Sequence, residues 1–178
     1  EISLSSLSSS DYSELEALTD YLIQTCENRK VNISLPSLCI DAFSLDVMSK
    51  VQDVRKSSLT FAPEAGTQRL RNIINKSITD EHIYSAAEQA IRLGYHNIKL
   101  YFMIGLPGQT AETLADDLLL LQEIGCDMAG MGPFIPHPDT PLRELSSGST
   151  ETTKRVVALA RILLPKLNLP ATTSLGVL

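Results

Sequence analysis

The stretch KLYFMIGLPGQT, from Lys99 to Thr110, joins an apolar run with strand character to the start of a helix. Two glycines and a proline form the corner between them, and Thr110 is a residue type that commonly caps a helix. A strand that leads into a helix through such a corner is the repeating unit of parallel α/β folds. The corner either only turns the chain or also holds a ligand, and the rest of the sequence bears on both possibilities.

Strand and helix patterns alternate about six times along the chain. Strands are expected at 1–4, 31–38, 58–66, 96–107, 128–136 and 169–178, and the helices between them should begin near Asp11, Ser44, Thr67, Thr79, Thr110 and Thr150. The connections are short and no hairpin dipeptide separates two strands, which favours parallel strands joined by right-handed crossovers. The predicted fold class is therefore α/β, as part of a (β/α) barrel or as a doubly wound sheet.

The composition is that of one globular domain with a sizeable core, since 43% of the 178 residues are apolar and 20% are charged. No apolar run approaches the ~20 residues that a membrane helix needs. The net charge of −6 disfavours nucleic acid and anionic membranes as partners. The chain has no initiator methionine and opens directly on a predicted strand, which suggests a fragment or an excised piece of a longer protein.

The three cysteines, Cys26, Cys39 and Cys126, are separated by 13 and 87 residues. This spacing matches neither a zinc site, nor a redox pair, nor an iron–sulfur loop. We expect reduced, partly buried thiols in a cytoplasmic protein, because the first residues also lack the pattern of a secretory signal.

Ligands of parallel α/β folds bind at the carboxyl ends of the strands. Glu64 is held in a strand-end turn there, where it could bind an amine or a ribose hydroxyl or instead cap the helix that starts at Thr67. Arg69 and Arg71 follow, and they either bind a ligand carboxylate or form a solvated face.

Further along, His137 and Asp139 could form a metal or acid–base pair, or only a rigid loop. Lys99 and Tyr101 share one face of a strand, and they become functional candidates if that face points into a barrel. Thr172 and Thr173 also reach the carboxyl rim if the last strand ends early.

Longer segments carry a family resemblance. SLTFAPEAGTQRLRNIINKSIT (58–79) followed by IKLYFMIGLP (98–107) resembles the radical SAM superfamily. From Glu1 to about Leu106, SLSSSDYS and VNISLPSLCIDAFS add a resemblance to radical SAM proteins with a B12-binding domain. From about Gly105 to Leu178, GLPGQT, DMAGMGPFIPHPDTPL and RILLPKLNLPATTSLGVL resemble the radical SAM enzyme of [FeFe]-hydrogenase maturation, a relative of biotin synthase.

The resemblance implies a partial (β/α) TIM-like barrel that lacks its first strand, forming one domain over 1–178 with a seam near 103–110. The two resemblances are expected either from a natural or engineered hybrid of two half-barrels or from one divergent family. It also implies S-adenosylmethionine (SAM) as ligand and a [4Fe-4S] cluster that is held by CxxxCxxC and cleaves SAM reductively to a 5′-deoxyadenosyl radical. The CxxxCxxC pattern does not occur in this sequence. The chain is therefore expected to be either the SAM-binding part of a radical SAM enzyme or a catalytically inert module. An open barrel would leave strand edges near Ile2 and Val177, so we expect self-association or marginal stability.

The resemblance also assigns residues to the cofactor. Ser8, Ser9 and Ser10 take the place of a Gly-Gly-Glu segment that binds the SAM amino group. Groups near the SAM ribose, carboxylate and adenine complete the expected site, and the full candidate set is Ser8, Ser9, Ser10, Glu64, Arg69, Arg71, Tyr101, Gly105, Phe134 and Ile135. No catalytic residue and no metal ligand is assigned.

Overall fold

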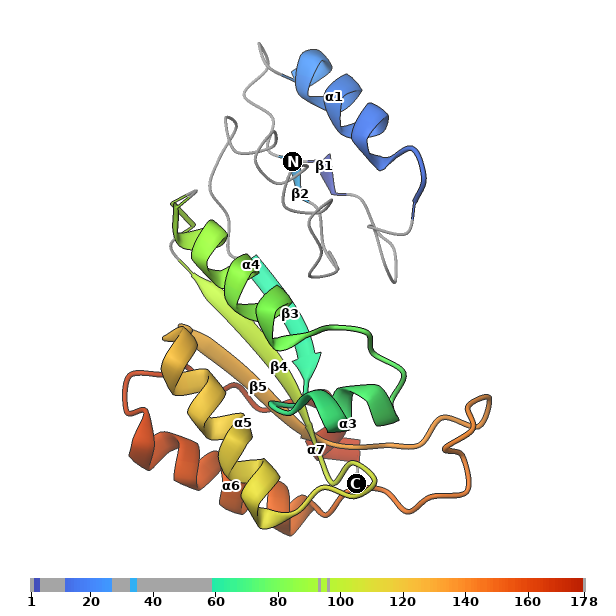
Figure 1. The fold of residues 1–178 in the computed structure, drawn as a ribbon, viewed down its shortest axis with the longest axis vertical. Coiled ribbons are helices and arrows are strands. Elements are labelled where there is room, and N and C mark those ends of the chain that lie inside the picture. Colours follow the sequence, from blue (N-terminus) through green and yellow to red (C-terminus); the bar gives the residue numbers. More distant parts are fainter. Residues whose placement is uncertain are drawn as a thin grey trace. The chain divides into compact units, whose positions relative to one another are not determined.

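The computed structural model describes residues 2–3, 12–26, 33–34, 59–92, 94–95 and 97–177 (Figure 1). The chain divides into two compact units, one made of residues 1–61 and 78–98, the other of residues 62–77 and 99–178. The strand expected over 31–38 is described only in part. The helix expected near Ser44 and the candidates Ser8, Ser9 and Ser10 lie outside the described residues.

The described part of the first unit contains one short strand pair and two helices. β1 (Ile2–Ser3) runs parallel to β2 (Ile33–Ser34), and the helices are α1 (Leu15–Cys26) and α4 (Asp80–Arg92). In α4, which begins after Thr79 as the sequence predicts, the apolar residues Ile83, Ala86, Ala87 and Ala90 are buried along one side of the helix. Thr79 caps this helix by accepting a hydrogen bond from His82 N at 3.1 Å, and Gly94 ends it with φ +76°.

Three strands form an open sheet in the order β3 (Leu59–Glu64), β4 (Ile98–Ile104), β5 (Met128–Pro133). The boundary between the two units falls within β3 and directly after Ile98. β4 pairs parallel with β5 from Lys99 opposite Met128 to Ile104 opposite Pro133. This register places the carboxyl ends of both strands side by side.

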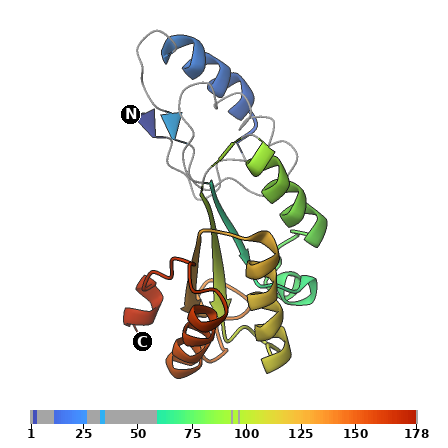
Figure 2. The same cartoon turned by 90° about the vertical axis from the view of Figure 1, so that its left-hand side faces the viewer.

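The two faces of this sheet differ in the second unit. Leu100, Phe102 and Ile104 of β4 are buried together with their partners on β5, whereas Tyr101 and Met103 point to the other face. Figure 2 shows α5 (Ala111–Ile124) on one side of the strands and α7 (Thr173–Val177) on the other. We call the side that carries Tyr101 and Met103 the open face.

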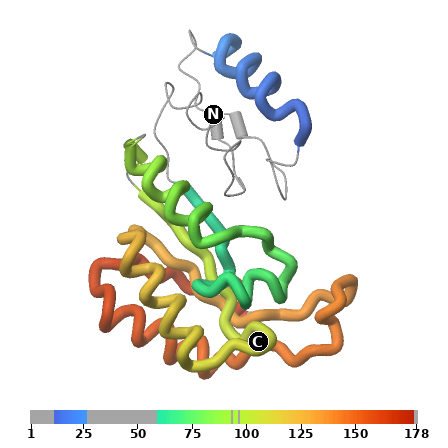
Figure 3. The backbone as a smooth tube through the Cα atoms, viewed as in Figure 1, coloured from blue at the N-terminus to red at the C-terminus, as the bar shows by residue number. Residues whose placement is uncertain are grey.

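The remaining helices follow the predicted positions closely. α3 (Gln68–Ile73) begins after Thr67, and Thr110 caps α5 in a reciprocal arrangement with Thr113. A long connection, 134–149, leads from β5 to α6 (Thr150–Leu163), which is capped by Ser149 (Figure 3). Four buried residues from the segments after β3, β4 and β5 pack together in a small core cluster: Ala65, Leu70, Leu106 and Phe134.

The strand predicted over 169–178 is wrong. Asn168 makes a single parallel bridge to Met128, its carbonyl accepting from Ala129 N at 3.0 Å. Pro170 has no N–H, so it cannot extend this ladder. The chain then forms α7, and Thr172 Oγ1 donates to Met131 O at 3.1 Å. Among the described residues no helix has the length and apolar character that crossing a membrane requires.

Candidate functional site

A cavity of about 490 Å³ lies on the open face of the sheet, toward the carboxyl ends of the strands. All three strands contribute to it, and so does the segment that leads into α7. Its wall includes Glu64, Tyr101, Phe102, Met103, Gly130, Gly132, Pro133, Ile135, Pro170, Ala171, Thr172, Thr173 and Ser174. The structure therefore brings together Glu64, Tyr101 and Ile135 of the sequence-predicted set.

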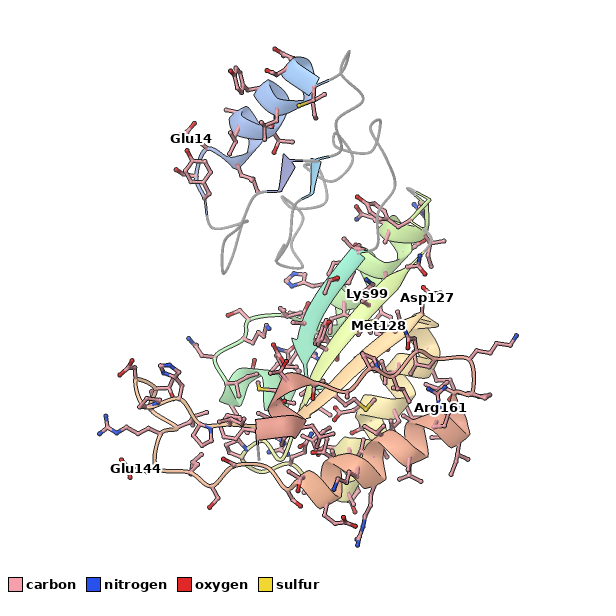
Figure 4. All side chains as sticks on the ribbon, turned by 180° about the vertical axis from the view of Figure 1, so that it is seen from behind. Glu14, Lys99, Asp127, Met128, Glu144 and Arg161 are labelled. Carbon is pink, nitrogen blue, oxygen red and sulfur yellow. The ribbon has the colours of Figure 1, made fainter. Side chains whose placement is uncertain are left out.

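Tyr101 lies across Gly130 of the neighbouring strand. A Cβ placed on Gly130 would come within 2.5 Å of Tyr101 Cε1, so the ring occupies the space of the missing side chain. The ring remains 37% exposed. Lys99, labelled in Figure 4 on the same strand, is half-buried on the same face. Of the two orientations that the sequence left open, the structure thus selects the one that faces away from α5.

Glu64 ends β3 with φ +68°, in the left-handed region that non-glycine residues rarely adopt. Its Oε1 accepts a hydrogen bond from Lys76 Nζ at 3.0 Å, and the two side chains are 21% and 28% exposed. Backbone strain of this kind costs on the order of 1 kcal/mol and gathers at functional sites. The helix cap position is taken by Thr67, so Glu64 is a partly shielded carboxylate at the cavity rather than the cap of α3.

The two arginines behave differently from each other. Arg69 is exposed, and its Nη2 donates to Gly108 O at 2.7 Å, which ties α3 to the glycine corner. Arg71 is fully buried, and its Nη1 donates to Ala65 O at 2.9 Å. The interpretation of the pair as a solvated face is therefore wrong for Arg71. Its guanidinium supports the turn after β3, and its expected contact with a ligand carboxylate stays a prediction.

The corner at 105–110 packs against the 134–149 connection. Gly105 has φ +88°, and a Cβ there would lie 2.5 Å from Gly148 Cα. Phe134 N donates to Ile104 O at 2.8 Å, and Gly148 N donates to Phe134 O at 2.7 Å. Phe134 is 6% exposed and belongs to the core cluster. Gly105 and Phe134 join the 134–149 connection to the sheet, and their expected place beside an adenine stays a prediction.

Asp117 is a buried carboxylate that the sequence reasoning missed. It is fully buried on α5, where Oδ1 accepts from Gly66 N at 2.5 Å and Oδ2 accepts from Gln109 Nε2 at 3.0 Å. Burial raises the pKa of Asp117 from 3.8 to about 7. The charge of Asp116 also raises this pKa, whereas the two hydrogen bonds and the charge of Arg71 oppose the rise. Helical spacing between the apolar Leu114 and Leu121 marks this position as inward-facing.

The described residues offer no metal site. No group of three or more His, Cys, Asp or Glu side chains is placed to hold an ion in this part of the chain. His137 and Asp139 are exposed and separated by 3.9 Å between Nδ1 and Oδ2, within a turn closed by Thr140 N donating to His137 O. Cys26 and Cys126 are buried free thiols, and burial raises the pKa of Cys126 to about 11. Cys39 lies outside the described residues.

Comparison with known proteins gives a consistent result. The family model described as Radical SAM superfamily matches residues 1–121. The chain is similar to the [FeFe] hydrogenase maturase subunit HydE of Thermotoga maritima, with 60% identity over 74 residues, or 42% of this chain and 21% of that protein. It is also similar to an uncharacterized protein of Methanocaldococcus jannaschii, with 33% identity over 127 residues, or 67% of this chain and 28% of that protein.

Among solved structures, methylornithine synthase (PylB) superposes with a TM-score of 0.72 at 17% identity, over 89% of this chain and 46% of that one. This similarity confirms the predicted fold class, a partial (β/α) barrel, and the sheet formed by the described strands is not closed. The chain spans between about a fifth and a half of the length of these relatives. The resemblance to proteins with a B12-binding domain and the seam near 103–110 stay predictions.

Proposed function

Because the chain belongs to the radical SAM superfamily, we propose that it is the SAM-binding part of a radical SAM enzyme and that SAM occupies the cavity on the open face. The observation that carries this proposal is the position of the cavity. It lies at the carboxyl ends of parallel strands, where ligands of such folds bind, and it is walled by Glu64 in a rare backbone conformation.

The chemistry of the wall suits the parts of SAM. The Glu64 carboxylate can accept hydrogen bonds from ribose hydroxyls or from the ammonium group, and Lys76 holds it in place. The Tyr101 ring, with Met103 and Ile135, offers an apolar and aromatic surface for adenine and for the sulfonium cation. Thr172, on the segment before α7, adds a hydroxyl at the same wall.

The described residues do not fit the [4Fe-4S] cluster that the family implies. Such a cluster is held by cysteine thiolates, but the two described cysteines are buried, and the pKa of Cys126 keeps that thiol protonated at neutral pH. The sequence also lacks CxxxCxxC. The reductive cleavage of SAM is therefore not assigned to the described residues. The proposal assigns SAM binding to its own residues and the cluster ligands to residues outside it.

Titration calorimetry of the 178-residue chain with SAM tests the proposal. We expect saturable binding, and we expect Glu64→Gln to weaken it about tenfold, because a hydrogen bond to a charged group is lost. Glu144→Gln is the matched control, since Glu144 is an exposed carboxylate in the 134–149 connection. Absence of heat at millimolar SAM would support the alternative of an inert module.

We also propose a cytoplasmic location. The free thiols of Cys26 and Cys126 suit a reducing compartment. Thiol labelling and fractionation of cells that express the chain test this. Recovery of the protein in an oxidised form from an extracytoplasmic fraction would contradict it.

A further inference from the structure

We propose that Asp117 is a positioning residue: its carboxylate joins the corners after β3 and β4 and thereby fixes Glu64 and Met103 at the cavity wall. Asp117 itself does not line the cavity. Both of its oxygens are used within the protein, one by each corner. Only the SAM-binding readout of this inference rests on the proposed function; the connection between the corners can be measured without ligand.

The first connection runs to the corner after β4. Gln109 Nε2 donates to Asp117 Oδ2 at 3.0 Å, while Gln109 Oε1 accepts from Gly105 N at 2.5 Å and from Leu106 N at 3.2 Å. The same Nε2 lies 3.5 Å from the carbonyl oxygen of Met103, which is part of the cavity wall. Asp117 therefore helps to fix the orientation of the Gln109 amide, together with the backbone groups of the corner that the same amide binds.

The second connection runs to the corner after β3. Gly66 N donates to Asp117 Oδ1, and Gly66 stands two residues after Glu64. α5 approaches so closely here that a Cβ on Gly66 would lie 2.8 Å from Asp117 N. On the far side of the turn, Arg71 Nη1 donates to Ala65 O at 2.9 Å. The turn that places Glu64 at the cavity is thus held between Asp117 and Arg71.

Protonation weakens this arrangement. Both neighbours of the carboxylate are N–H donors, and a protonated carboxyl accepts their hydrogen bonds less strongly than a charged carboxylate does. The charged groups that act on Asp117 are Arg71 from α3 and Asp116 from α5 itself. With a pKa near 7, Asp117 should hold the two corners less tightly as the pH falls through neutrality, although protonation also removes the cost of burying its charge.

A double variant that exchanges donor and acceptor between positions 109 and 117 tests the hydrogen bond between these side chains directly. Asp117→Asn alone places an amide against the Gln109 amide and should weaken SAM binding about tenfold at a pH of about 8. Adding Gln109→Glu restores a donor–acceptor pair and keeps an acceptor for Gly105 N and Leu106 N, so most of the affinity should return. Asp116→Asn, a neighbouring exposed carboxylate, is the control and should leave this affinity unchanged.

A ligand-free measurement separates this inference from the proposed function. In the unsubstituted chain, the Gly66 amide proton should shift with pH in nuclear magnetic resonance spectra, with a midpoint near 7. Asp116→Asn should lower that midpoint, and Asp117→Asn should abolish the shift. A flat Gly66 titration, or a double variant that binds SAM as weakly as Asp117→Asn, overturns the positioning role. If the unsubstituted chain fails to bind SAM while Gly66 titrates as expected, only the proposed function is lost.

Discussion

Tyr101 and Gly130, directly opposite each other on β4 and β5, share one space: the tyrosine ring fills the volume that a side chain at Gly130 would need. The pair lies on the open face of the sheet and forms part of the cavity wall. Because the ring is 37% exposed, it can move when it is pushed. A substitution at either residue should therefore change the shape of the cavity more than the packing of the core.

Gly130→Ala should displace the Tyr101 ring and weaken SAM binding. We expect a loss of about 1 kcal/mol in the free energy of unfolding, the lower range for overpacking, because the obstacle is a partly exposed side chain. In a Tyr101→Ala background the same substitution should cost almost nothing. Urea unfolding and SAM titration of the unsubstituted chain, the two single variants and the double variant measure this coupling. Additive effects of the two substitutions would show that the residues do not share a space.

Gly105→Ala should be far more damaging than Gly125→Ala. Both glycines have a positive φ, +88° and +64°, but a Cβ at Gly105 meets the backbone of Gly148 whereas a Cβ at Gly125 meets nothing within 4 Å. We expect about 1 kcal/mol of destabilisation at Gly125 and at least about 3 kcal/mol at Gly105, where backbone must shift. Thermal unfolding of the two variants provides the comparison, and equal melting temperatures would contradict the close approach.

The buried carboxyl of Asp117 should make stability depend on pH. Its pKa is raised from 3.8 to about 7 on folding, so between these values the folded chain binds more protons than the unfolded chain. Stability must then fall as the pH rises from about 4 to about 7, with no further change from this group above that. We expect Asp117 to make the chain roughly 1–3 kcal/mol less stable at a pH of about 8 than at about 5.

Urea unfolding at several pH values measures this effect as the difference between the unsubstituted chain and Asp117→Asn. Glu144→Gln, which alters an exposed carboxylate, should keep the full slope. A slope that Asp117→Asn leaves unaltered would assign the pH dependence to other groups.

Self-association is expected because the described sheet ends at β3 and β5 without closing. Sedimentation velocity should show a larger species as the protein concentration is raised about a hundredfold, since strand edges can pair between copies. The predicted edge near Val177 is wrong, because this residue belongs to α7, and the edge of the described sheet is β5. A single monomeric species over the whole concentration range would contradict the expectation.

Much of the fold was predictable because apolar periodicity is local. The buried stripe of α4 and the caps at Thr79 and Thr110 follow directly from the sequence. The segment 169–178 also has the composition of a strand, but a strand needs a partner with free hydrogen-bonding groups. Pro170 removes a donor two residues after the bridge at Asn168, and this local detail outweighed the apolar pattern.

The candidate site was predictable only in part. Glu64 and Tyr101 stood out as polar groups at a strand end and on a strand face, and both line the cavity. Arg71 and Phe134 had suitable residue types, but their burial depends on tertiary packing that a linear pattern does not contain. Asp117 could not be predicted, because the role of a single acid within an apolar stripe depends on its hydrogen bond to Gly66, which is distant in the sequence.

The contact between Gly66 and α5 has a consequence for the family's sequence variation. A side chain at position 66 would push α5 away and break the hydrogen bond to Asp117, so neither residue can change alone without loss. Related chains should therefore change the two positions together: a residue larger than glycine at 66 should coincide with a non-acidic residue at 117. Such paired substitutions would identify the relatives in which α5 has moved away from the turn.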